Sequence, residues 1–419
     1  SLKRLKNNSI IKLKLVHMTG EEIRNYFPYF KFNKKSIYFD SAATTHKPQS
    51  VIDTIIGFYQ KYNSNIHRSM NKAATVATQK FENSRALVKE LLNAEHSSEI
   101  VFTNGATDSI NLVAQSFLKS QVKKNDIILI SETEHHSNLV PWQQLALETG
   151  AKIEFLPIRD DLLVDTEKIK AKINDKVKLI STHHISSISG RKQNIEKIIK
   201  IAKSLNIPIL IDGAQAIAHT PIDVKELDCD FYCFSGHKLF GPTGTGILYS
   251  KNRHLDGFIP HKFGGGMVDN VSLHENSFSE LPHRLEAGTP NISGVIGLGE
   301  AVNFVKSVGF SVIKEIETKL TEKFNHELSK VDNCVLVGSG PRSAPIFTFN
   351  IEGIHHYDLA SLLSEYNICT RSGHLCSQPM IEMCGLSGAV RASLSIYNNE
   401  EEIENFMVIL KKAISFLKR

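Results

Sequence analysis

The residue with the most distinctive chemical surroundings is Lys238. It lies within Phe234–Gly246, at the end of an apolar run and directly before a glycine-rich loop. A lysine at a buried sheet edge is unfavourable unless it is paired or used covalently, and the glycines allow close backbone approach. Lys238 is therefore a candidate for a Schiff base with a carbonyl cofactor. Taken alone, it also fits a surface lysine beside a turn.

Asp212 is the second candidate. It ends the apolar run Ile209–Ile211 and is followed by small residues and Gln215. A carboxylate at the end of a strand lies where open α/β sheets bind ligands. There it can pair with the nitrogen of a pyridine ring, or it can simply cap the next helix. The two residues together, an aspartate that ends one strand and a lysine that ends a later one, indicate such a cofactor site more specifically than either residue alone.

The loop Asn104–Asp108 stands between a predicted strand and a predicted helix. Backbone N–H groups at a helix N-terminus, such as that of Ala106, bind anions, and the Thr107 hydroxyl adds a donor. The loop therefore predicts a phosphate site, which Ser235 and His237 would complete from the lysine strand. Ordinary helix capping is the alternative.

A pair of histidines follows the predicted strand 127–131, within Glu134–Asn138. The imidazole of His135 could stack on a planar cofactor ring, whereas loop histidines are commonly only polar surface. Adjacent side chains point apart and no carboxylate spacing accompanies them, so no metal site is predicted here or elsewhere in the chain.

Cys376 lies in the loop Thr370–Pro379, flanked by glycine and proline. Nearby Arg371 and His374 favour the thiolate, which is the nucleophilic form. Arg391 stands in an otherwise apolar segment, where a planar guanidinium could hold a substrate carboxylate through two hydrogen bonds. A surface cysteine and an arginine with a buried stem are the alternatives.

The elements that must position these residues are apolar runs rich in β-branched residues, alternating with amphipathic runs. This pattern predicts an α/β fold with a large, mostly parallel sheet flanked by helices, and a smaller α+β domain at the C-terminus. Strands are expected at 37–39, 99–103, 127–131, 152–157, 177–182, 208–212, 231–235, 246–249 and 343–350. Helices are expected at 108–118, 195–205, 356–366 and 400–417, and long amphipathic runs occupy 294–330. The predicted units are a basic extension (1–17), a segment packing on the small domain (18–40), the large domain (41–295) and the small domain (296–419), which carries the Cys376 loop.

Composition narrows the function classes. The 419 residues carry a net charge of +5, part of which comes from the acid-free residues 1–17, so nucleic-acid binding has little support. We find no apolar run of the ~18 residues that a membrane span needs. Six cysteines make no disulfide framework and suggest a reducing compartment. The basic lead fits either a transit remnant, which would indicate a plastid-type organelle such as an apicoplast, or a solvated tail of a cytoplasmic protein.

These motifs together resemble the cysteine desulfurases of the class V aminotransferase group, and most closely the SufS type (type II). The resemblance extends from about residue 36 to residue 400. Its motifs are Tyr38–Thr44, Asn65–Arg68, Glu134–Asn138, Asp212–Gln215, Ser235–Lys238, Glu286–Pro290 and Arg371–Cys376. It implies the fold-type I architecture of pyridoxal-phosphate enzymes, with a seven-stranded type of sheet in the large domain.

The resemblance also implies roles for individual residues. The cofactor would be pyridoxal 5'-phosphate, bound to Lys238, with Asp212 on the ring nitrogen, Gln215 on the ring hydroxyl and His135 stacked on the ring as a possible acid or base. The phosphate would be held by Ala106, Thr107, Ser235 and His237, joined by Thr289 from the partner subunit of a homodimer. Arg391, with His67 and Arg371 nearby, would bind the carboxylate of L-cysteine. Cys376 would attack the substrate sulfur and leave L-alanine.

Partners follow from the same resemblance: a SufE-like (or SufU-like) sulfur acceptor and the SUF scaffold proteins of iron–sulfur cluster assembly. A selenocysteine lyase, or another β-lyase on the same scaffold, is the alternative and would not need Cys376 in the same way. Four positions depart from the family pattern. Asp108 stands where a glutamate usually follows the threonine of the phosphate loop, and Ser69 stands where a glycine usually follows His67 and Arg68. Ser187 stands where an asparagine usually helps to bind the ring hydroxyl, and Leu375 stands where a histidine usually precedes the cysteine.

Overall fold

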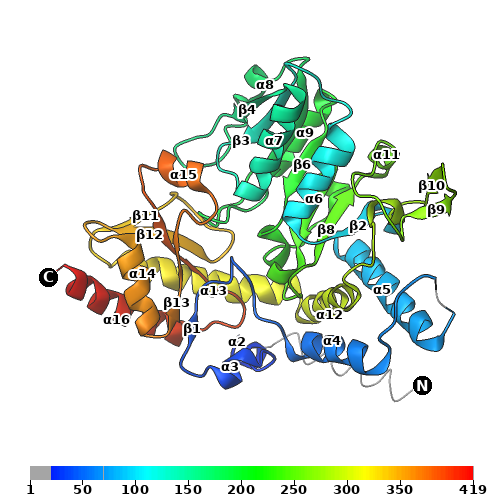
Figure 1. Cartoon of the computed structure of the whole chain (residues 1–419). Coiled ribbons are helices and arrows are strands. Elements are labelled where there is room, and N and C mark those ends of the chain that lie inside the picture. Colours follow the sequence, from blue (N-terminus) through cyan, green and yellow to red (C-terminus); the bar gives the residue numbers. More distant parts are fainter. Residues whose placement is uncertain (1–19, 69, 419) are drawn as a thin grey trace.

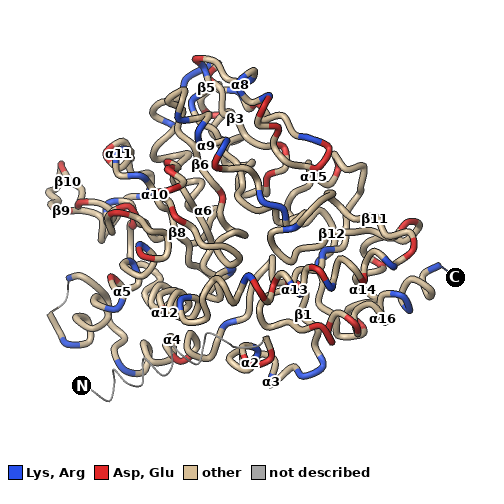
Figure 2. The backbone as a smooth tube through the Cα atoms, turned by 180° about the vertical axis from the view of Figure 1, so that it is seen from behind, with Lys and Arg blue, Asp and Glu red and all other residues tan. Residues whose placement is uncertain are grey.

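The structure is a computed structural model that describes residues 20–68 and 70–418. The predicted basic extension, residues 1–17, lies outside the described residues, so its link to a cellular compartment stays a prediction. Figure 1 shows two parts, a large domain built on one broad sheet and a smaller domain that carries the C-terminus. Figure 2 shows segments with Lys and Arg and segments with Asp and Glu scattered over both parts.

The large domain is organised by a seven-stranded sheet with the order β2-β8-β7-β6-β5-β3-β4. Its strands are β2 (Ile100–Thr103), β3 (Ile127–Ser131), β4 (Lys152–Leu156), β5 (Val177–His183), β6 (Ile209–Asp212), β7 (Phe231–Ser235) and β8 (Gly246–Ser250). Only β8 runs antiparallel to its neighbours, and the other neighbouring pairs are parallel. The predicted α/β fold with a mostly parallel seven-stranded sheet is therefore confirmed.

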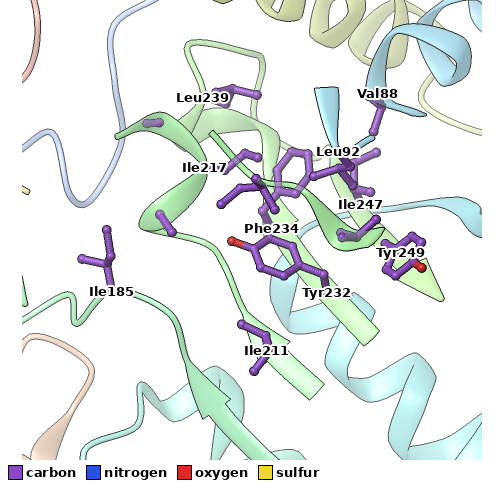
Figure 3. Close-up of a cluster of buried hydrophobic side chains, with 14 of the residues drawn as sticks. Val88, Leu92, Ile185, Ile211, Ile217, Tyr232, Phe234, Leu239, Ile247 and Tyr249 are labelled. Carbon is purple, nitrogen blue, oxygen red and sulfur yellow. The ribbon is translucent and has the colours of Figure 1, made fainter. Parts of the chain in front are cut away.

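Helices cover both faces of this sheet, which explains why its strands read as continuous apolar runs. On one face, apolar side chains of α5 (Lys72–Leu91), α9 (Ile195–Ser204) and α12 (Ile292–Val308) join the core. In Figure 3, Tyr232 and Phe234 of β7 pack there with Ile247 of β8. The other face packs against α6 (Ala106–Leu112), its π-helical continuation (Val113–Leu118) and α7 (Val140–Thr149).

Shorter elements complete the large domain. They are α4 (Gln49–Lys61), α8 (Ile169–Lys172), α10 (Val224–Leu227), α11 (Asn252–Leu255) and a hairpin of β9 (Val268–Val271) and β10 (Asn276–Phe278). Helix α12 approaches α5 closely at Gly299, which has no side chain; a Cβ there would lie only 2.3 Å from Oγ of Ser84. A larger residue at this position would push the two helices apart.

The small domain contains a four-stranded antiparallel sheet with the order β11-β12-β15-β14. Its strands are β11 (Cys334–Leu336), β12 (Ile346–Ile351), β14 (Arg371–Gly373) and β15 (Ala389–Ser393), and its helices are α13 (Phe310–Leu328), α14 (His356–Glu365), α15 (Gln378–Met383) and α16 (Glu400–Leu417). The N-terminal elements are α2 (Gly20–Arg24), α3 (Tyr29–Phe32) and β1 (Ile37–Tyr38). Strand β1 pairs with β13 (Ile368–Cys369), which joins the N-terminal segment to the small domain.

The structure adds detail to one predicted stretch of amphipathic runs and shifts the start of one predicted helix. The stretch 294–330 is divided at Gly309, whose φ of +83° ends α12, and α13 leaves at 77° to it. The helix expected at 108–118 begins two residues earlier, at Ala106, and becomes π-helical at Val113. Among the described residues, no individual helix has the length and apolar character to cross a membrane, and only the bent pair α12 and α13 meets that test jointly.

Candidate active site

A cavity lies where the carboxyl ends of the central strands of the large sheet meet β14 and β15 of the small domain. Strand ends of the large sheet supply the site residues predicted from Asp212 and Lys238, as expected for an open α/β sheet. The cavity brings together most of the predicted residues: Ala106, Thr107, His135, Ser187, Asp212, Gln215, Ser235, His237, Lys238, Arg371 and Arg391.

Lys238 ends a 3-10 turn (Gly236–Lys238) that directly follows β7. Its surroundings exclude water and lower the pKa of its amine to about 8, while the nearby carboxylate of Asp212 opposes this shift. With this pKa, roughly a tenth of the amine is unprotonated at pH 7, much more than for an ordinary lysine, and this is the form that reacts with a carbonyl group.

Asp212 and Gln215 present free oxygen atoms to the cavity. Oδ1 of Asp212 accepts a hydrogen bond from the backbone N–H of Ala214 at 2.9 Å, and Oδ2 has no partner among the described residues. Burial raises the pKa of Asp212. Nε2 of Gln215 donates to the carbonyl of Ala42 at 2.8 Å, so its Oε1 remains available. This pair can meet a ring nitrogen and a ring hydroxyl.

Hydrogen-bonding groups that line the cavity also gather at the start of α6. The backbone N–H of Ala106 donates to Oγ of Ser235 at 2.8 Å, and Oγ of Thr107 lies 2.7 Å from Oγ of Ser137. Nδ1 of His237 is buried with no partner among the described residues. Hydroxyl and N–H groups at a helix N-terminus suit a phosphate.

His135 is held as a neutral imidazole. Its Nδ1 accepts the backbone N–H of Ser137 at 3.1 Å, which places the ring proton on Nε2. Burial, together with the charge of Lys238, lowers the pKa of His135 to about 3. The residue can therefore donate a hydrogen bond from Nε2 without carrying a charge at neutral pH.

Arg371 and Arg391 lie opposite each other on the antiparallel strands β14 and β15. The buried Arg391 donates to the carbonyl of Ser187 at 3.1 Å and to Oδ1 of Asp40 at 3.3 Å, and its Nε has no partner among the described residues. Arg371 reaches the same carboxylate at 3.8 Å. One carboxylate thus faces two guanidinium groups, and the excess positive charge suits an anionic substrate.

Cys376 is exposed beside this cavity, near enough that its charge affects the pKa values of both Lys238 and Arg391. It follows Leu375, which is only 5% exposed and packs in an apolar cluster with Ile188, Val337, Met380, Ile381 and Ala389. Leu375 and Cys376 have φ values of +55° and +58°. Non-glycine residues rarely adopt this left-handed conformation, which costs about 1–2 kcal/mol per residue. The departure at Leu375 therefore supplies the apolar anchor of a strained loop.

Cys376 lies beside the cavity and not in its lining, and two other predicted residues are not brought to the cavity of this chain at all. Thr289 is exposed, which leaves its predicted contact to a second subunit untested. His67 lies before α5, where its ligand atoms and those of Glu82 and His283 are within 4.8 Å of one another. Glu82 already forms an ion pair with Arg85 at 2.8 Å. The roles of Thr289 and His67 stay predictions.

Sequence reasoning missed Lys47. Its amine donates to the carbonyl oxygens of Thr45 and of His237, the residue before Lys238, the latter at 3.1 Å. Thr44 and Thr45 donate to the same His237 oxygen. Burial lowers the pKa of Lys47 to about 8. The only sequence feature that could have pointed to Lys47 is a lysine in the loop after β1. The pattern of strands does not show that this loop lies against Lys238.

This combination defines a class of protein. A lysine and an aspartate at neighbouring strand ends, with phosphate donors beyond them, form the site of a fold-type I pyridoxal-phosphate enzyme. The sequence model of the class-V aminotransferase family matches residues 37–406. The chain belongs to that family.

Curated relatives and solved structures agree with this assignment. A probable cysteine desulfurase from Halalkalibacterium halodurans is 39% identical over 94% of this chain and 98% of its own length. The cysteine desulfurase of Wigglesworthia glossinidia brevipalpis is 39% identical over 95% of this chain and 98% of its own. The crystal structure of the cysteine desulfurase CsdA from Escherichia coli matches with a TM-score of 0.90 and 35% identity, covering 96% of this chain and all of CsdA.

The family implies pyridoxal phosphate as the cofactor, and the residues present fit it. The free Oδ2 of Asp212 and Oε1 of Gln215 suit the ring, and the unpartnered Nδ1 of His237 lies among the phosphate donors. A cradle this narrow needs glycine, because a Cβ on Gly246 would lie 2.3 Å from Cα of Gly105.

Proposed function

We propose that this chain is a pyridoxal-phosphate-dependent cysteine desulfurase, which converts L-cysteine to L-alanine and keeps the sulfur as a persulfide on Cys376. The observation that carries the proposal is the position of Cys376. Its loop is anchored by the buried Leu375 and lies beside a cavity that is lined by both Lys238 and Arg391. An aminotransferase would not need a thiol at this place.

Substrate binding follows from charge. Arg391 and Arg371 orient the carboxylate of L-cysteine, because Asp40 neutralises only one of the two guanidinium groups. When bound, pyridoxal phosphate supplies an electron sink for the substrate α-carbon. Nζ of Lys238, with its pKa of about 8, can take a proton from that carbon and return it near neutral pH. Nε2 of His135 can donate a hydrogen bond within the same cavity.

The sulfur step is balanced without an added oxidant or reductant. The thiolate of Cys376 attacks the substrate sulfur, an S–S bond forms and the C–S bond breaks. The electron pair of that bond stays with the substrate carbon, which takes up a proton and becomes the methyl group of alanine. Cys376 and L-cysteine therefore give a persulfide and L-alanine.

The subtype and partners are further parts of the proposal. The short spacing from Arg371 to Cys376 supports the SufS type, which delivers sulfur to a SufE-like or SufU-like acceptor for iron–sulfur cluster assembly. An exposed thiol at Cys376 allows such a transfer. A homodimer would let the exposed Thr289 reach the phosphate of the neighbouring subunit.

The test is a paired assay on the purified holoprotein, with Cys376→Ala as the variant. We expect the wild type to release alanine and, with reductant, sulfide from L-cysteine. The variant should keep the visible cofactor band but lose alanine release from L-cysteine. A coloured wild-type protein that stays inert toward L-cysteine, with reductant and a SufE-like acceptor present, would contradict the proposal.

A further inference from the structure

Two hydrogen bonds connect the Cys376 loop to the segment that follows β3. The backbone N–H of His136 donates to the carbonyl of Cys376 at 2.8 Å. The backbone N–H of Gln378 donates to Nε2 of His136 at 3.1 Å. One residue of the large domain therefore holds the loop of the small domain on both sides of Ser377.

The second bond serves as a helix cap. Helix α15 begins at Gln378, and the first N–H groups of a helix have no acceptor within it. Ser377 occupies the N-cap position but its side chain makes no capping bond, and its Oγ is buried without a partner among the described residues. His136 thus provides, from the other domain, the acceptor that Ser377 does not provide.

The cap matters because the backbone before it is strained. Leu375 and Cys376 both adopt positive φ, which the open chain would not favour. The anchor of Leu375 fixes one end of this strained pair, and the contacts of His136 fix the other. Any loss at His136 gives the backbone of Cys376 freedom to leave its place beside the cavity.

We infer that His136 is the positioning residue of the nucleophile: its neutral imidazole caps α15 and holds Cys376 beside the cavity. This role rests on the proposed function of Cys376. His136 itself does not line the cavity, so it acts through the loop and not on the cofactor or substrate.

The role requires an unprotonated Nε2, because only that form accepts a hydrogen bond. The ionisable groups that interact with His136 are His135 beside it and His374 in the loop. On α15, the carboxylate of Glu382 accepts a hydrogen bond from the side chain of Gln378 at 2.7 Å. Partial burial and the charge of His374 lower the pKa of His136 below its ordinary value. The cap is therefore present at neutral pH and is lost as the pH falls through this lowered pKa.

The experiment compares His136→Ala with His136→Gln in the holoprotein. Both variants keep the backbone N–H, but only glutamine offers an acceptor, Oε1, near the position of Nε2, and it does not titrate. Hydrogen exchange is followed at the amides of residue 136 and Ser377, which bond to the loop carbonyls of Cys376 and His374. With alanine we expect exchange to rise about three- to tenfold at both amides, the usual effect of one lost hydrogen bond. Glutamine should remain within about twofold of the wild type.

Activity provides the readout that a general loss of stability would not give. With alanine, kcat for alanine formation should fall about three- to tenfold, while the KM for L-cysteine and the visible cofactor spectrum stay unchanged. The ratio of wild-type to glutamine-variant kcat should be constant above pH 7 and fall at more acidic pH, because every titration that the two proteins share cancels in the ratio and only His136 differs. Replacing His374 with glutamine should move that fall to higher pH.

Wild-type exchange and kcat in His136→Ala would overturn the inference, as would a glutamine variant that behaves like alanine. If no protein in the series forms alanine from L-cysteine, the proposed function fails. The exchange measurements still decide whether His136 holds the loop.

Discussion

Leu375→Ala tests whether the apolar anchor keeps the Cys376 loop in its strained conformation. Leu375 is 5% exposed, and truncation of a buried leucine to alanine costs about 2–5 kcal/mol. A loop can relax around the missing atoms, so the lower part of that range, about 2–3 kcal/mol, applies here. The positive φ angles of Leu375 and Cys376 each disfavour the closed conformation of the loop by about 1–2 kcal/mol. In the alanine variant, the packing of the leucine side chain no longer offsets this cost.

The assay is hydrogen exchange at the amide of Ser377, which bonds to the carbonyl of His374 at 2.9 Å. If the loop opens locally, a loss of 2–3 kcal/mol corresponds to a protection factor lower by about 30- to 150-fold. We expect kcat for alanine formation to fall as well, because Cys376 spends less time beside the cavity. Leu375→Met, which conserves volume, should cost less than about 1.5 kcal/mol and keep most of the protection.

The matched control is Leu363→Ala, at a fully buried position of α14 in the core of the small domain. It should lower the free energy of unfolding by a similar amount but leave the local protection of Ser377 unchanged. Equal protection of Ser377 in Leu375→Ala and the wild type would refute the anchoring argument. Equal losses in Leu375→Ala and Leu363→Ala would show that this amide exchanges only through global unfolding.

Three other predictions follow from the site. Cofactor uptake by the apoprotein should accelerate as the pH rises through about 8, because the reactive form of Lys238 is the unprotonated amine. Stopped-flow absorbance measures the uptake rate, and a rate independent of pH would contradict this prediction. Arg391→Lys should raise the KM for L-cysteine by about 10- to 100-fold, because it loses a charge-assisted hydrogen bond worth about 1.5–3 kcal/mol. Steady-state kinetics measure this change, and an unchanged KM would mean that the substrate carboxylate binds elsewhere. Lys47→Met should lower kcat about tenfold, because it removes the charged donor that binds the carbonyl of His237, the residue before Lys238. The melting temperature, measured beside the kinetics, separates this effect from unfolding. An unchanged kcat would show that Lys47 has no role in holding that turn.

The sequence predicted the fold and the meeting of Asp212 and Lys238 at one cavity, for a physical reason. Asp212 and Lys238 end strands of a buried parallel sheet, and such strands leave a strong pattern of β-branched residues whose carboxyl ends meet at one edge. Helix ends were less accurate. Gly309 divided a stretch that still looks continuous by its apolar spacing, because a single glycine does not show whether it will adopt positive φ.

What the sequence did not reveal are contacts between segments far apart in the chain. Lys47 reaches the carbonyl of His237 across 190 residues, and His136 reaches Gln378 across 242. Both contacts involve backbone atoms, which carry no sequence signal of their own. Leu375 illustrates the same limit, since a departure from the family pattern became an anchor only when the cluster around Ile188 and Met380 was known.

The two sides of the site therefore differ in how they are held. Asp212 ends β6 and Lys238 ends the turn after β7, so the buried sheet places both, and the contact of Lys47 with His237 adds to the hold on that turn. Cys376 is placed by an unfavourable backbone, one apolar side chain and two hydrogen bonds to His136. A nucleophile that must first react in the cavity and then pass sulfur to another protein gains from this second arrangement, because small changes in binding energy suffice to move it. An acceptor protein that contacts the loop at His374 or Gln378 would compete with the His136 cap. We therefore expect its binding to raise hydrogen exchange at the amide of residue 136, and acceptor binding that leaves this amide protected would contradict the argument.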